Sequence, residues 1–246
     1  MIFSSLKGIF KEKYFENSIN YWDILKLTRY YFPKYYPSIG FFKRKYYTLV
    51  TDLTESEENI FSKFKKTTRY KINRGKREKI VFEVEKDLDI FLKYYNHFAK
   101  SKNLEPLKYQ TLLKYQKNML ITKAIYYDKI LVMHVHIYNT EVSMLLFSAS
   151  HFRNTLENKE KNLISYANLF LHYEDMLFFK KEGCSLYDFG GYAYGTKDKS
   201  FMGINHFKEL FNPILTIRYI YTSWTLELIV LSKKLITQMG IKVQKL

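Results

Sequence analysis

The chain has 246 residues, of which 47% are hydrophobic, so it is long enough to bury a substantial core and short enough to form one domain. Lys and Arg total 40 against 24 Asp and Glu, and the net charge of +16 indicates a polyanionic partner: nucleic acid, a nucleotide-linked substrate, a pyrophosphate lipid or an anionic membrane. An AT-rich genome, which raises the Lys content without selection for binding, is the competing explanation. The single cysteine, Cys184, excludes an internal disulfide framework, and we expect it to fill a buried position.

The N-terminal sequence lacks the apolar core and cleavage site of a signal peptide, and no uninterrupted apolar run approaches the ~20 residues that span a bilayer. We therefore expect a cytoplasmic protein. Peripheral contact with the inner face of the membrane stays open, because the helix that carries Trp224 is apolar enough to rest in a membrane interface as well as to dock on a sheet.

The first clear element is a basic amphipathic helix over residues 56–79, in which apolar residues recur at helical spacing and cations crowd the other positions. We expect it to end or bend at Gly75. Residues 80–84 alternate as a strand does, and Asp87 can cap a helix that runs to about residue 102. A short helix over residues 107–117 follows.

Three β-rich runs come next, over residues 121–127, 130–138 and 142–150. Asp128 and Asn139 suit tight turns between them, which favours an antiparallel meander. The later elements are a long helix over 163–181 that ends before Gly183, a strand over 185–189, a helix over 203–211, a strand over 214–221 and the helix with Trp224. This mixture indicates an α/β layer architecture with a largely antiparallel sheet.

The segment most informative about chemistry runs from Tyr187 to Gly191 in the order Tyr-Asp-Phe-Gly-Gly, and Lys208 follows in a predicted helix. A strand that ends in paired glycines lets a ligand approach the backbone closely, and a lysine nearby can stabilise a developing oxyanion. By spacing alone, a tight turn beside an ordinary surface lysine explains the segment slightly better.

The order of a helix, Gly183, the YDFGG segment, a glycine-containing loop and a helix with Phe207 and Lys208 resembles the end of the Fem-type aminoacyltransferases, a branch of the GNAT acyltransferase superfamily. The basic segment RYKINRGKREKI, at residues 69–80, resembles another part of that family. The resemblance covers about residues 61–221.

The resemblance implies an α/β, GNAT-like fold in which a central, mostly antiparallel twisted sheet is flanked by helices. Residues 56–246 are expected to form this single domain, and residues 1–55 an N-terminal cap or remnant. The best-known members have two GNAT-like copies, and about 55 residues are too few for the first copy. A dimer would supply a second copy, although no residue demands one.

The resemblance also implies an N-acyltransferase that moves an aminoacyl or acyl group onto an amine of a peptidoglycan or surface-polysaccharide precursor, which can be lipid-linked. It places Lys208 near the donor carbonyl, and Asp188 where it orients the loop or binds the acceptor amine. The substrate-binding residues that we expect are Arg69, Arg74, Tyr187, Gly190, Gly191, Phe207 and His136. Asn212 stands where the family usually has glycine, and Asn tolerates a positive φ better than most residues.

No permanently bound cofactor is expected, and the donor is aminoacyl-tRNA or acyl-CoA. A CoA-dependent GNAT enzyme normally has spaced glycines that hold the pyrophosphate at a helix N-terminus, and residues 151–166 contain no glycine. This favours aminoacyl-tRNA. Two alternatives remain open: an acetyl-CoA-dependent sugar N-acetyltransferase of polysaccharide biosynthesis, and a non-catalytic module that binds nucleic acid or membrane.

The histidines leave a second question open. His134 and His136 face the same side of a predicted strand, and His172 and Asp175 share a helix face. No further ligand and no HExxH-like signature accompany them, so we expect no metal and interpret them as satisfied interior or cleft histidines. A role for one of them in proton transfer or substrate binding stays an alternative.

Overall fold

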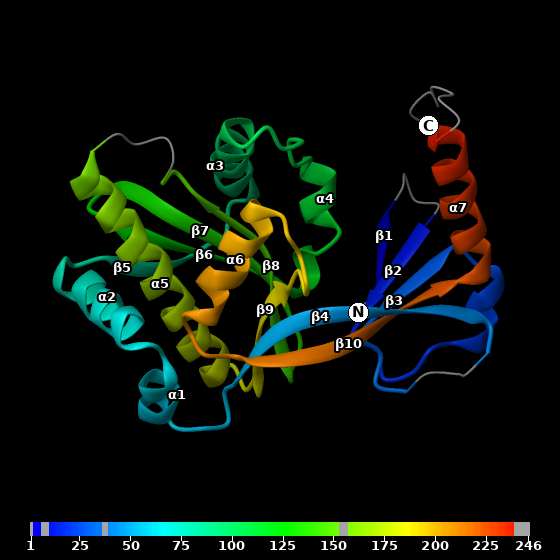
Figure 1. Ribbon diagram of the computed structural model, residues 1–246, viewed down its shortest axis with the longest axis horizontal. Helices are drawn as coiled ribbons and strands as arrows, with labels where there is room; N and C mark the ends of the chain where they lie inside the picture. Colours follow the sequence, from blue (N-terminus) through cyan, green and yellow to red (C-terminus); the bar gives the residue numbers. More distant parts are fainter. Residues whose placement is uncertain (1, 6–9, 36–38, 153–156, 239–246) are drawn as a thin grey trace. The chain divides into compact units, whose positions relative to one another are not determined.

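The structure is a computed structural model that describes residues 2–5, 10–35, 39–152 and 157–238. The chain forms two compact units: a smaller one, Met1–Tyr46 with Ile217–Leu246, and a larger one, Tyr47–Thr216 (Figure 1). It passes from one unit to the other within β4 (Phe41–Asp52) and again within β10 (Ile214–Ser223). The predicted separation of residues 1–55 from residues 56–246 stays a prediction.

The larger unit contains a six-stranded sheet in the order β4-β9-β8-β7-β6-β5. Its other strands are β5 (Val81–Glu85), β6 (Met119–Tyr126), β7 (Lys129–Tyr138), β8 (Val142–Ser150) and β9 (Leu186–Gly191). All neighbours are antiparallel except β8 and β9, which run parallel. The predicted antiparallel meander of β6, β7 and β8 is confirmed.

Helices cover both faces of this sheet, and β7 shows why. Its residues alternate: Val132 packs in the core cluster beneath α5, and Met133 and Val135 pack in the cluster beneath α3. The helices are α1 (Glu57–Lys63), α2 (Lys66–Arg77), α3 (Leu88–Ser101), α4 (Tyr109–Leu113), α5 (Asn158–Lys181) and α6 (Lys199–Glu209), with a 3₁₀ turn η2 (Gln116–Asn118) (Figure 1). Within the described chain, no helix is both long and apolar enough to cross a membrane.

The predicted helix over residues 56–79 is wrong in one respect, because the structure has two helices there. Phe64 adopts an extended backbone and buries its ring in the core between α1 and α2. The Arg69 guanidinium donates to the carbonyls of Ser62 and Phe64 and so braces the break. Gly75 does not end the second helix: it packs against α5, where an added Cβ would lie 3.3 Å from Cβ of Phe170.

Three smaller sequence expectations can be compared with the structure. Cys184 is buried, as predicted, and burial raises the pKa of its thiol to about 11. Asn212 has a φ of 49°, so it lies in the left-handed region, which Asn tolerates better than most residues. Helix α5 begins at Asn158, five residues before the predicted start at residue 163.

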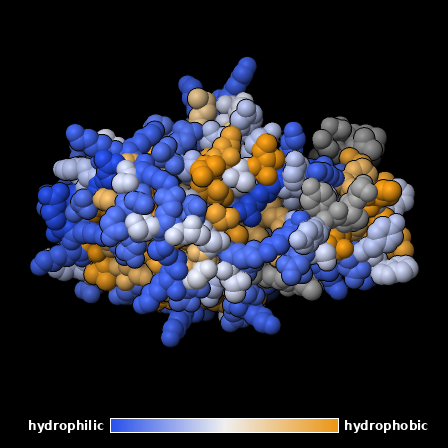
Figure 2. All heavy atoms as spheres, turned by 90° about the horizontal axis from the view of Figure 1, so that it is seen from below, coloured by the Kyte–Doolittle hydropathy of each residue, from blue (hydrophilic) through white to orange (hydrophobic). Residues whose placement is uncertain are grey.

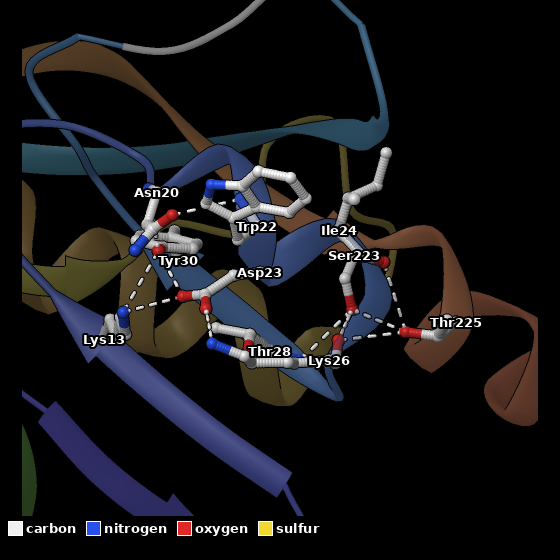
Figure 3. Close-up of polar contacts among 10 residues, drawn as sticks. All are labelled: Lys13, Asn20, Trp22, Asp23, Ile24, Lys26, Thr28, Tyr30, Ser223 and Thr225. Carbon is white, nitrogen blue, oxygen red and sulfur yellow. Dashed lines mark hydrogen bonds and ion pairs between the residues drawn. The ribbon is translucent and has the colours of Figure 1, made fainter.

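The smaller unit contains a sheet in the order β1-β2-β3-β10, with β1 (Ile2–Ser5), β2 (Phe10–Tyr14) and β3 (Thr28–Tyr31), the turn η1 (Tyr21–Leu25) and the helix α7 (Trp224–Gln238). The buried carboxylate of Asp23 organises it: Lys13, Lys26 and the hydroxyl of Tyr30 all donate to Asp23 (Figure 3). Although burial opposes ionisation, these donors lower the pKa of Asp23 to about 2. The network fixes η1 against the sheet.

Candidate active-site cleft

The larger unit contains a cleft of about 570 Å³ between α5, α6 and the second half of β8. It exists because β8 and β9 pair only from Val142–Leu186 to Met144–Asp188, after which β8 continues without β9. In Figure 1, α6 follows β9 and lies over this region. The polar side chains that line the cleft are Lys102, Ser148, Ser150, Ser165, Asn168, His172, Lys199, Ser200 and Lys208.

Lys208 lies near the end of α6, and its chain is largely buried as it reaches the cleft. Its Nζ atom donates to the carbonyls of Gly191, at 2.6 Å, and Gly190, at 3.3 Å. Burial lowers the pKa of Lys208 to about 8, and the negative charge of Asp188 opposes that shift in part. The group is therefore a cation at neutral pH that loses its proton more readily than an ordinary lysine.

The glycine pair that receives Lys208 is shaped by Asp188. Oδ1 of this buried carboxylate accepts from the backbone N–H of Gly190, at 2.8 Å, and from the hydroxyl of Thr48. Gly190 has a φ of +73°, and an added Cβ would lie 2.8 Å from the carbonyl oxygen of Leu145. Only glycine fits here, so β9 can turn and aim two carbonyls at Lys208.

His172 projects from α5 into the same cleft and joins a buried network behind it. Its Nδ1 atom lies 2.8 Å from the hydroxyl of Tyr187, and that hydroxyl lies 3.1 Å from Nε2 of His136. Since Tyr187 engages Nδ1, Nε2 is the ring nitrogen of His172 that remains for the cleft. Three elements, α5, β9 and β7, contribute these three side chains.

A second branch of the network starts at Asn168, which also lines the cleft. Its side-chain oxygen lies 3.3 Å from Nε2 of His134, whose Nδ1 lies 2.7 Å from Oδ2 of Asp175. The same carboxylate oxygen lies 3.7 Å from Nε2 of His136, so the two branches meet at Asp175. Asp175 is thus hydrogen-bonded to His134 and lies close enough to His136 for its charge to act on that ring.

Burial sets the protonation of these groups. It lowers the pKa of His136 to about 4, against the attraction of Asp175, and lowers the pKa of His172 well below the usual value, with neighbouring His134, His136 and Lys208 adding to the effect. Burial also raises the pKa of Tyr187 well above its usual value. Both histidines are therefore neutral at pH 7, and a proton that either ring accepts is held weakly.

Ligand atoms of His134, His172 and Asp175 all lie within 4.8 Å of one another, a spacing that can hold a metal ion. Hydrogen bonds already engage both rings, to Asp175 and to Tyr187, and all three side chains are buried. We interpret the group as a hydrogen-bonded network, and the expected absence of a metal stays a prediction.

The structure brings most of the predicted site residues together. Lys208 and Phe207 line the cleft, and Gly190 and Gly191 hold Lys208. Three predicted site residues are fully buried behind the cleft wall: Asp188, Tyr187 and His136. Asp188 is hydrogen-bonded to Gly190, Tyr187 contacts His172, and His136 contacts Tyr187.

Arg69 and Arg74 do not join this cleft. Arg69 braces the junction of α1 and α2, and Arg74 pairs with Glu78 and lines a separate cavity of about 410 Å³ near the start of α5. Four residues of the site were not predicted from the sequence: His172, Asn168, Ser148 and Ser150. For His172 a signal was present, since it lies three residues before Asp175 on one helix face; Asn168 and the serines gave none.

No family model matches the sequence, and no curated protein matches it. Among solved structures, a crystal structure of FemX is similar, at 12% identity and a TM-score of 0.57 over 75% of this chain and 63% of that one. The C-terminal domain of a predicted lysylphosphatidylglycerol synthetase from Agrobacterium fabrum has 13% identity and a TM-score of 0.60, over 96% and 85% of the two chains. L-PGS from Bacillus licheniformis has 15% identity and a TM-score of 0.53, over 90% and 75%.

This chain therefore spans less than two thirds of the FemX chain that it matches. At such identities the likeness concerns the fold and not the reaction. The expected α/β architecture, a mostly antiparallel sheet flanked by helices, is confirmed, and the chain has a GNAT-like fold.

Proposed function

We propose that the protein is an N-acyltransferase that moves an aminoacyl or acyl group onto an amine within the cleft. The observation that carries the proposal is that one buried lysine cation, Lys208, and one neutral histidine, His172, line the same cleft. Acyl transfer to an amine needs both kinds of group: a cation where the carbonyl oxygen becomes negative, and a base that takes a proton from the amine.

In the proposed reaction, the amine nitrogen attacks the donor carbonyl while Nε2 of His172 accepts the proton that the amine loses. This requires the tautomer in which Nδ1–H of His172 donates to Tyr187. The Lys208 ammonium stabilises the oxyanion of the tetrahedral intermediate. When the intermediate collapses, the bond to the leaving oxygen or sulfur breaks, and the leaving group takes up the proton held by His172. An amide and a free hydroxyl or thiol result.

Aminoacyl-tRNA is the donor that the charges favour. Helix α5 begins with Glu157 at its N-cap, and Glu160 lies in its first turn. This is the helix end at which a CoA-dependent enzyme of this fold would hold a pyrophosphate, and Glu157 disfavours an anion there, whereas Glu160 is paired with Lys129.

The exposed face of α2 and its flanks offers a path for a phosphate backbone. The face of the molecule in Figure 2 is largely hydrophilic, with apolar residues gathered in smaller areas. The exposed cations of this segment are Lys63, Lys65, Lys66, Arg74, Lys76, Arg77 and Lys79. Binding through these residues would fall steeply with salt.

The acceptor that we propose is an amine of a peptidoglycan or surface-polysaccharide precursor. The cleft volume, about 570 Å³, is within the range of small-molecule sites, and its lining mixes serine hydroxyls with apolar side chains. A hydroxyl-rich glycan or peptide stem that ends in an amine suits such a lining.

The test is thermal stabilisation of the purified protein by acetyl-CoA, longer acyl-CoAs, and charged or uncharged tRNA, at low and moderate salt. Stabilisation by charged tRNA, followed by transfer to an amine, supports the proposal. Stabilisation by a CoA ester alone identifies a sugar or amine acetyltransferase instead.

The control for catalysis is a pair of lysine variants. Lys208→Ala should keep donor binding and lose turnover, whereas Lys197→Ala, at an exposed position outside the cleft, should keep both. Binding that is salt-sensitive, with no turnover in any variant, would indicate a non-catalytic binding module.

A further inference from the structure

The smaller unit carries an exposed apolar surface, which we call the aromatic patch and define by Trp22, Leu25, Ile39, Phe42 and Trp224. The exposed fractions are 73% for Trp22, 68% for Leu25 and 72% for Ile39, and Phe42 and Trp224 are nearly half exposed. Isolated apolar residues are ordinary on protein surfaces, but large side chains gathered on one surface mark an interaction site.

Three segments meet to form this surface. Residues of η1, the start of β4 and the start of α7 line one cavity of about 310 Å³: Ile24, Gly40, Phe41, Phe42 and Trp224. The hydroxyl of Thr225 in α7 donates to the carbonyl of Lys26, just after η1, which fastens the two elements together. In Figure 3, Trp22 and Ile24 lie on the side of η1 away from the Asp23 network, so the buried ions hold the turn while its apolar side faces outward.

The smaller unit, which carries the patch, has a larger net positive charge than the larger unit. The smaller unit contains 14 Lys and Arg against 4 Asp and Glu, whereas the larger unit contains 26 against 20. Exposed cations follow the patch residues directly along the chain: Lys26 after Leu25, and Lys43, Arg44 and Lys45 after Phe42. Lys26 pairs with Asp23 and Arg44 with Glu227, and their side chains nevertheless stay 57% and 50% exposed. A partner of this surface must therefore accept apolar side chains and carry negative charge.

We propose that the aromatic patch binds the surface of an anionic phospholipid bilayer. Trp side chains favour the headgroup region, Leu25 and Ile39 can enter the acyl boundary, and the neighbouring cations pair with lipid phosphates. Nucleic acid fits less well, because Leu25 and Ile39 offer no flat ring for bases to stack on. A second copy fits less well too, because two units of the same large positive charge repel each other.

The chain has two tryptophans, and both lie in the patch, so intrinsic fluorescence reports on it directly. The full-length protein is mixed with vesicles of phosphatidylcholine alone or of phosphatidylcholine with phosphatidylglycerol. Binding to the anionic vesicles should shift the tryptophan emission to shorter wavelength. This binding should weaken as the salt concentration is raised, and binding to the neutral vesicles should be much weaker.

A double variant, Leu25→Ser with Ile39→Ser, keeps both tryptophans and should weaken vesicle binding by about tenfold or more. Tyr127→Asn, at a side chain that is 80% exposed in the larger unit, is the matched control and should bind normally. Circular dichroism checks that each variant is folded. Absence of a shift with anionic vesicles, equal binding by the double variant, or a shift caused by self-association without vesicles would each overturn the proposal. Lys208→Ala should not affect binding, so the result is independent of the proposed reaction.

Discussion

The Nδ1 atom of His172 lies 2.8 Å from the hydroxyl of Tyr187, directly behind the cleft that also receives Lys208. This contact orients the imidazole and leaves Nε2 for a substrate. Tyr187 in turn contacts His136, so a proton taken up at His172 can be balanced by movement of a proton along the buried network. The base and its support come from different strands and helices.

Replacing His172 by Asn tests the proposed base. The Asn side chain retains a polar atom near Nδ1 that can still contact Tyr187, but it has no group that accepts the amine proton. We expect kcat to fall by about 10²- to 10⁴-fold with little change in KM. Steady-state kinetics and a thermal melt of the same preparation separate this result from a folding defect; an unchanged kcat would exclude His172 as the base.

Tyr187→Phe removes the hydroxyl that orients His172 and leaves the ring in the core. As a positioning residue, Tyr187 should affect kcat more than KM, by about tenfold, and the pH at which activity is lost in acid should change because His172 loses its partner. The pH profile of kcat is the decisive measurement. A variant that loses stability but keeps the wild-type profile would show that Tyr187 acts only in packing.

The segment from Gly190 to Lys208 shows how much of the site could be predicted from the sequence. Gly190, Gly191 and Lys208 lie within 19 residues, so a short motif and a family resemblance were sufficient to bring them together. His172, Tyr187 and His136 lie on separate elements, and their meeting depends on the register of β7 and on how α5 crosses the sheet. The hydrophobic periodicity of a single sequence predicts neither the register of β7 nor the way in which α5 crosses the sheet.

The break at Phe64 and the strands before residue 55 were missed for related reasons. Phe64 continues the helical pattern of apolar residues, and only its burial against Tyr173 and Phe211 makes the extended backbone favourable. Strands β2 and β3 are five and four residues long, too short for alternation to stand out among charged and aromatic neighbours. Strand β4 has 12 residues, but its first half is mostly exposed and its second half mostly buried, so it shows no period-two alternation.

Lys208→Met should change how stability depends on pH. The pKa of Lys208 is lowered from 10.5 to about 8 by burial, so between these values the unfolded chain holds a proton that the folded chain has released. The free energy of unfolding of the wild type should therefore rise with pH across this window relative to the variant, by about 3 kcal/mol in total. Urea unfolding of both proteins from pH 7.5 to 10.5 measures the difference; parallel curves would contradict a buried cation.

His136→Gln should reduce the sensitivity of the protein to acid. The pKa of His136 is lowered from 6.5 to about 4. Between these pH values the unfolded state binds a proton at this residue, whereas the folded state stays unprotonated there. Wild-type stability is lost progressively below pH 6.5, and the variant should lose less of it. The Gln amide can keep the contact with Tyr187, and unfolding midpoints at pH 7 and pH 4.5 give the comparison. An identical drop in both proteins would assign the acid sensitivity elsewhere.

Gly190→Ala and Gly195→Ala form a matched pair, since both glycines have positive φ, +73° and +69°. At Gly195 an added Cβ meets nothing within 4 Å, so the substitution costs only the backbone strain, about 1 kcal/mol. At Gly190 the same Cβ would lie 2.8 Å from the Leu145 carbonyl, so β9 must move and carry away the carbonyl that binds Lys208. We expect Gly190→Ala to destabilise by roughly 2–4 kcal/mol and to abolish turnover, whereas Gly195→Ala should remain active. Equal effects of the two substitutions would mean that the close approach at Gly190 is not required for the site.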